Sequence, residues 1–142
     1  MENKNEGNKT RKEDRKEELK AIVARVKEKA EDDFLEQERK RELKTREVID
    51  LVYSEILENV VYNIYYDRAR GFTDGNINIV LYQSVIDKFE IDEGEVEHYE
   101  RLIGLKIVME LEEIFNDVEI SYQESFGYIF NRHDCRVYWN VK

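Results

Sequence analysis

Apolar residues recur every three or four positions in the first third of the chain. From about Lys12 the residues favour a helix, and six apolar side chains stand at these spacings among charged neighbours: Leu19, Ile22, Val23, Val26, Ala30 and Phe34. This spacing predicts one narrow apolar stripe along a charged helix. The stripe needs a cover, which is the rest of the same protein, a second copy in a coiled coil, or another protein. Because no strict heptad is sustained, the pattern leaves all three open.

A second amphipathic pattern begins at Leu43 and has a broader apolar face. It ends at Arg68-Ala69-Arg70-Gly71, and basic residues followed by glycine are a typical helix C-terminus. The stretch between these two patterns, residues 36–42, is polar all round and contains no Gly or Pro. The sequence therefore leaves open whether residues 12–70 form one helix or two.

Alternation of apolar and polar residues predicts strands in the rest of the chain. After the Thr73-Asp74-Gly75 turn signal, residues 76–82 alternate and are expected to form a strand. Residues 84–89 fit either a short helix or more strand. Three further strands are predicted near the end, at 118–122, 128–130 and 136–141, with a turn at 131–134.

One more helix is predicted between these strands, over residues 92–115. Asp92 is expected to cap it, with Glu95 three residues later, and Gly104 is expected to allow the close approach of another element. The fold class is then α+β, with a long charged N-terminal helix and amphipathic helices packed on one face of a small, mostly antiparallel sheet. The expected organisation is a disordered tail (1–11), a charged helical segment (12–42) and an α+β domain (43–142).

Charge separates the two main segments. The 142 residues carry a formal net charge of -10, but residues 1–47 hold 15 basic and 14 acidic groups, a difference of +1. The remaining 95 residues hold 8 basic and 19 acidic groups, a difference of -11. Nucleic-acid binding by the acidic part would oppose a repulsive field, so it is disfavoured.

Few residues could carry catalysis or hold a metal. Cys135 is the single cysteine, and the two histidines are His98 and His133. One Glu-x-x-His pair, Glu95 to His98, is too little for a di-metal site, and the neighbours in His133-Asp134-Cys135 point to opposite faces if they lie on a strand. A hairpin turn with a half-buried cysteine is the favoured interpretation. No catalytic residue, metal or cofactor is therefore expected, and the chain is predicted not to be an enzyme.

An acidic stretch offers a second candidate surface: Asp87, Glu90, Asp92, Glu93, Glu95, Glu97 and Glu100. It lacks the rhythm of a calcium loop, so it is either a solvated face or a surface for a basic partner. No apolar run approaches the roughly 20 residues that span a bilayer. The polar N-terminus is unlike a signal peptide, so no membrane association and an intracellular location are expected.

In residues 48–142, a helix ends at Ala69 and Gly71 and is followed by a strand at 77–81, a helix at 102–115 and a late Val137-Tyr138-Trp139. This layout resembles small uncharacterised α+β proteins of giant DNA viruses and large phages. The charged segment 1–40 and the connection 83–92 depart from that pattern. The resemblance implies a viral accessory or virion-associated role, in the host cytoplasm or the virion, and no activity.

The sequence thus predicts a non-enzymatic interaction protein. Its N-terminal helix would associate with a second copy or with a protein partner through the apolar stripe. The alternative is an acidic inhibitor that masks a basic nucleic-acid-binding surface of a host protein.

Overall fold

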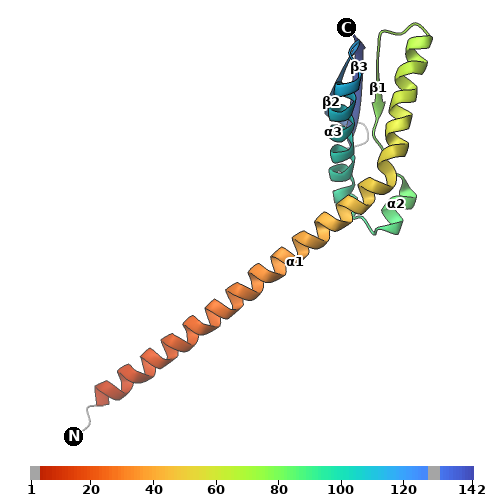
Figure 1. Ribbon diagram of the computed structural model, residues 1–142. Coiled ribbons are helices and arrows are strands. Elements are labelled where there is room, and N and C mark those ends of the chain that lie inside the picture. Colours follow the sequence, from red (N-terminus) through yellow and green to blue (C-terminus); the bar gives the residue numbers. More distant parts are fainter. Residues whose placement is uncertain (1–3, 128–131) are drawn as a thin grey trace. The chain divides into compact units, whose positions relative to one another are not determined.

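The computed structural model has an α+β fold (Figure 1) and describes residues 4–127 and 132–142, with side chains at 10–126 and 133–142. Its elements are α1 (Lys4–Ala69), β1 (Asp74–Asn78), α2 (Gln83–Lys88), the 3-10 turn η1 (Glu93–Glu95), α3 (Val96–Ile114), β2 (Val118–Gly127) and β3 (Arg132–Val141). The predicted fold class is confirmed.

Residues 4–69 form a single helix, so the second of the two amphipathic patterns continues the first. The polar stretch 36–42 does not interrupt it, because each added residue gains one hydrogen bond once a helix has started. The same helix includes residues 4–11, where the sequence predicted a disordered tail. The remaining residues of the predicted tail, 1–3, lie outside the described part.

Contacts divide the chain into two compact units, Met1–Leu43 and Lys44–Lys142. The arm is defined here as residues 10–43, the part of the first unit with described side chains. The body is the second unit, residues 44–142, and it contains one hydrophobic core. The core takes side chains from α1, α3 and the sheet: Val48, Val52, Ile56, Val60, Ile64, Tyr99, Ile103, Ile107, Leu111, Val118, Ile120, Val137 and Trp139.

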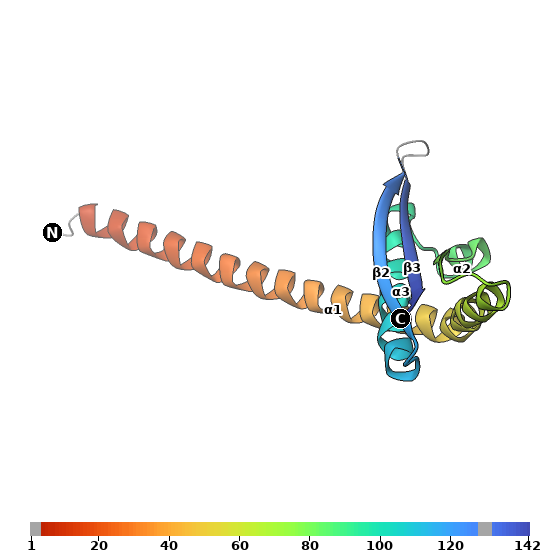
Figure 2. The same ribbon diagram turned by 90° about the horizontal axis from the view of Figure 1, so that it is seen from above.

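The described strands form an antiparallel sheet in the order β1-β3-β2. Alternation gives it an apolar face, with Ile77, Val137 and Ile120, and a polar face, with Asn76 and Tyr138. Helix α3 contacts β2 and β3 and lies beside them in the view from above (Figure 2).

Gly104 is the point of closest approach between α3 and the sheet. A Cβ atom there would lie 2.7 Å from the ring of Tyr122 on β2. Only hydrogen leaves room for that ring, which confirms the close approach that the sequence predicted.

The C-terminus of α1 is capped as the sequence predicted. Gly71 has φ 91°, a left-handed conformation that costs glycine little. Its backbone N–H donates to Arg68 O at 3.0 Å, and the N–H of Phe72 donates to Asp67 O at 3.0 Å. These two bonds form a Schellman motif, which satisfies the last carbonyl groups of the helix.

Between β1 and α3 the structure differs from the predicted strand and cap. Strand β1 ends at Asn78 rather than at residue 82. The N–H of Ile79 still donates to Cys135 O on β3 at 2.7 Å, but the N–H of Leu81 donates to the carboxylate of Glu100 instead. Residues 84–89, left open by the sequence, lie mostly in the helix α2. Asp92 precedes the turn η1, but its side chain makes no capping hydrogen bond; its backbone carbonyl accepts from the N–H of Glu95 instead.

The C-terminal strands are longer than predicted. Strands β2 and β3 pair over ten residues each, from Val118 with Val141 to Gly127 with Arg132. The turn predicted at 131–134 is wrong for Arg132 to Asp134, which belong to β3, because their backbone groups pair with β2. The strand predicted at 128–130 falls on residues outside the described part.

Candidate interaction surface

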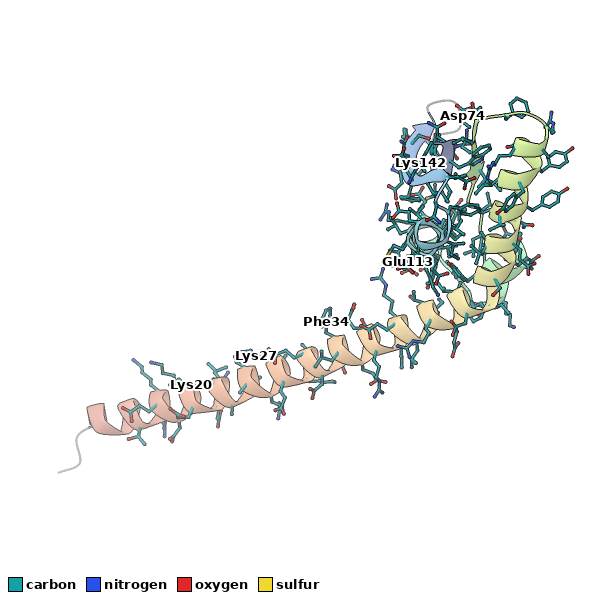
Figure 3. The ribbon with its side chains drawn as sticks, turned by 45° about the horizontal axis from the view of Figure 1, so that its top comes forward. Lys20, Lys27, Phe34, Asp74, Glu113 and Lys142 are labelled. Carbon is teal, nitrogen blue, oxygen red and sulfur yellow. The ribbon has the colours of Figure 1, made fainter. Side chains whose placement is uncertain are left out.

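The apolar stripe of the arm is exposed to solvent. Leu19, Ile22, Val23, Val26 and Phe34 keep between 44 and 65% of their surface exposed, and Ala30 is exposed as well. Phe34 is labelled on the arm in Figure 3. On the same helix, apolar residues of the body are 0–5% exposed at Val48, Val52 and Ile56. The described residues of the arm's own unit do not cover the stripe.

The stripe contains both seven- and eleven-residue spacings. Leu19 and Val26 are seven positions apart, as are Val23 and Ala30, while Leu19 and Ala30 are eleven apart, as are Val23 and Phe34. Both spacings bring residues back to nearly the same side of a helix. The six residues of the stripe therefore lie on one side of the arm.

Phe34 lies on an open, largely apolar part of the arm surface together with Ala30, Glu31 and Leu35. Leu35 was not among the predicted interaction residues, although its side chain is exposed. Phe34 is the largest apolar residue of the stripe and lies at its C-terminal end. An aromatic side chain in such a position is a common anchor in protein interfaces.

Ion pairs along the arm join neighbouring turns of the same helix. They are Arg15–Glu18 at 3.8 Å, Lys20–Glu17 at 3.8 Å, Lys27–Glu31 at 3.9 Å and Arg39–Glu36 at 2.6 Å. Each exposed pair of this kind contributes only about 0.3–0.5 kcal/mol to helix stability. These pairs support the helix without covering the stripe.

The predicted acidic surface is smaller than expected. Asp87, Glu90, Asp92 and Glu93 are exposed, and Glu95 and Glu97 are half-buried. Glu100 is buried, with 4% of its surface exposed, and accepts the hydrogen bond from Leu81 at 2.9 Å. It is wrong to count Glu100 as surface: its carboxylate holds the chain where it leaves the sheet.

The cysteine and histidines do not assemble a reactive group. Cys135 is buried rather than half-buried, and burial raises the pKa of its thiol, which disfavours the nucleophilic thiolate. The ring of His133 packs against Phe126 at 5.3 Å, and His98 lies against Tyr99 at 6.0 Å. Among the described residues, no group of three His, Cys, Asp or Glu side chains is placed to hold a metal ion.

The polar face of the sheet carries an open hollow of about 560 Å³. Its lining includes Asp74, Asn76, Glu119, Ser121, Tyr138 and Asn140. Asp74 and Glu119 are the two register partners of Asn140, so a row of polar groups crosses the strands. The carboxylates in this row are exposed, unlike the desolvated groups that characterise catalytic clefts.

Aromatic residues gather at the C-terminal end of α1. The rings of Tyr62 and Tyr66 stack at 5.7 Å, and the Arg70 guanidinium lies 5.5 Å from the centre of Tyr66 and 5.0 Å from that of Phe72. Each such cation–π contact contributes about 0.5–1 kcal/mol at an exposed site. These aromatic rings therefore already contact one another and an arginine.

Comparisons with protein-family models, curated proteins and solved structures find no match to this chain. The viral role that the resemblance implies stays a prediction. None of the helices among the described residues is both long and apolar enough to cross a membrane.

Proposed function

We propose that this protein is a non-enzymatic interaction protein, and that its arm associates through the apolar stripe with another polypeptide, either a second copy or a partner. The observation that carries the proposal is the exposure of the stripe in a chain whose body buries residues of the same types. An extended row of apolar groups on a regular helix is the form in which helices dock into grooves or pair with other helices.

The energy available from the stripe sets the expected strength of association. Full burial of one such side chain contributes about 1.5–3 kcal/mol, and roughly half of that remains to be gained at each half-exposed position. Association costs at least about 4 kcal/mol in lost freedom. The stripe alone therefore supports weak to moderate binding, and the charges beside it must add to affinity or choose the partner.

Substitutions in the full chain test the proposal. The stripe variant carries Leu19→Gln, Val23→Gln and Phe34→Gln, which replace three of the six stripe residues. The control carries Ala21→Gln, Ala24→Gln and Glu28→Gln, which change the opposite side of the arm. Mass is measured by light scattering, and binding by titration with two peptides: residues 10–43 as they stand, and the same peptide with the sign of every charge inverted.

We expect the full chain to associate with itself or with at least one peptide. The control variant should keep this association, and the stripe variant should lose it. Circular dichroism checks that both variants keep their helix. The proposal fails if the chain stays monomeric and binds neither peptide up to about 100 µM, or if association survives in the stripe variant.

The second candidate function is masking of a basic nucleic-acid-binding surface by the acidic stretch. It is supported by the exposure of Asp87, Glu90, Asp92 and Glu93 within seven residues. Competition between this chain and duplex DNA for an oligo-arginine peptide tests it. Loss of competition in a variant with these four residues changed to Asn or Gln supports it, and unchanged competition eliminates it.

A further inference from the structure

The charges of the arm are sorted by side. Successive residues of an α-helix are about 100° apart, so each charge can be assigned to the half of the helix that carries the stripe or to the other half. On the stripe half of residues 10–43 there are eight basic residues and one acidic residue, Asp33. On the other half there are three basic and ten acidic residues. The arm thus has no net charge, but its two sides differ by +7 against -7.

The eight basic residues surround the stripe. Four precede it: Arg11, Lys12, Arg15 and Lys16. Two, Lys27 and Lys29, lie beside it, and two, Lys40 and Arg41, follow it. All eight are exposed, so the apolar stripe lies within a basic border. A count of charge along the sequence, near neutral here, conceals this arrangement.

The basic border disfavours pairing of two identical arms through their stripes. Such pairing would bring the lysines and arginines of one copy against those of the other, in whichever direction the helices run. Like charges facing one another beside an apolar seam destabilise it and redirect pairing to a partner of opposite charge. The narrow stripe and the acidic opposite side also differ from the wide apolar face of helices that lie on anionic membranes.

We propose that the arm binds an amphipathic helix whose apolar stripe is bordered by Asp and Glu. The inference rests on the proposed function and names the partner's chemistry. Apolar contact supplies attraction, and the borders of opposite sign exclude a second arm and fix the orientation of the partner.

The two arm peptides provide the test. The charge-inverted peptide keeps the apolar residues, the length and the zero net charge, but it borders its stripe with acids. We expect the full chain to bind the inverted peptide at least about tenfold more tightly than the native peptide in low salt. The eight basic residues of the chain's border would then face acidic residues of the peptide instead of basic ones. The preference should shrink at about 1 M salt, where charges are screened beyond roughly 3 Å.

Two variants with equal loss of charge localise the effect. Changing Arg15, Lys27 and Lys29 to Gln on the stripe half should remove most of the preference for the inverted peptide. Changing Lys20, Arg25 and Arg39 to Gln on the other half should leave it. Equal effects of the two variants would contradict a side-specific border.

The outcomes separate this inference from the proposed function. Equal binding of both peptides, preference for the native peptide, or a stable dimer of the full chain through its stripe overturns the inference and leaves arm-mediated association standing. Binding to vesicles of phosphatidylserine and phosphatidylcholine without binding to the inverted peptide overturns it in favour of a lipid surface. If the chain is monomeric and binds neither peptide, both the inference and the proposed function are overturned.

Discussion

The arm and the body divide one helix, and its apolar residues have opposite environments in the two parts. Ile22 in the arm is 44% exposed, whereas Ile56 in the body is 5% exposed. Both belong to amphipathic patterns of similar spacing. The difference teaches that such a pattern identifies a helix face that needs cover, and that the cover itself depends on what the rest of the chain places against it.

The two parts also use charge differently. In the arm, opposite charges balance over the segment but separate by side. In the body, the carboxylates that matter for the fold act singly, as Glu100 does with Leu81 and as Asp117 does with Arg68 at 2.7 Å. Under the proposed function, charge in the arm bears on partner choice, whereas charge in the body bears on local structure.

The largest contrast should come from truncating one isoleucine in each part. Ile103→Ala empties a site that is fully buried in the body, and we expect it to lower the free energy of unfolding by about 2–5 kcal/mol. Ile22→Ala in the arm should change it by no more than about 0.5 kcal/mol. Urea unfolding followed by circular dichroism measures both, and similar losses would mean that the stripe is covered within the chain.

A smaller contrast is expected between a buried and an exposed glutamate. Glu100→Ala leaves the N–H of Leu81 without its acceptor, which should cost about 1–3 kcal/mol of stability. Glu93→Ala, at an exposed position, should stay within about 0.5 kcal/mol. Thermal and urea unfolding of both variants measures these losses of stability. If Glu100→Ala does not change the free energy of unfolding, the hydrogen bond to Leu81 does not stabilise the fold, and Glu100 belongs with the acidic surface after all.

Close packing of the body can be tested at its glycines. Gly104→Ala forces a methyl group into the ring of Tyr122 and should destabilise the protein by about 1–3 kcal/mol. Gly94→Ala is the control, because a Cβ there meets nothing within 4 Å, and it should be neutral or slightly stabilising. The near-ultraviolet circular dichroism of the tyrosines should change in the first variant and not in the second.

The smallest effect concerns the acid dependence of stability. The hydrogen bond from Arg68 lowers the pKa of Asp117 in the folded protein. The ion pair therefore contributes fully above the ordinary carboxyl pKa of about 3.9, and its contribution is lost as the pH falls through the lowered value. Asp117→Asn should reduce the fall in melting temperature over that acidic range.

Two controls accompany this measurement. Arg68→Gln should reduce the acid dependence in the same way, because it breaks the same ion pair. Glu18→Gln, which breaks a pair 3.8 Å apart on the arm, should leave the profile unchanged. A profile unaffected by Asp117→Asn would show that the pair does not persist in solution.

Local features of the fold were predictable from local chemistry. Gly71 after basic residues predicted the end of α1, and the small side chain of Gly104 predicted a close contact. The limits of β1 and the burial of Glu100 were not predictable, because both depend on a hydrogen bond between residues 19 positions apart. The length of the final hairpin depends on pairing between strands, which single-strand alternation does not report.

The candidate site shows the same division. The six residues of the stripe were identified from their spacing alone. The basic border is also encoded in the sequence, but it is recognised only when each charge is assigned to one side of the helix. The sequence by itself determined the helical periodicity of residues 12–70, the α+β class and the apolar stripe, because these follow from periodicity and local propensity. Only the tertiary structure decided which apolar faces are covered, since burial depends on residues that lie far apart in the chain and close together in the core.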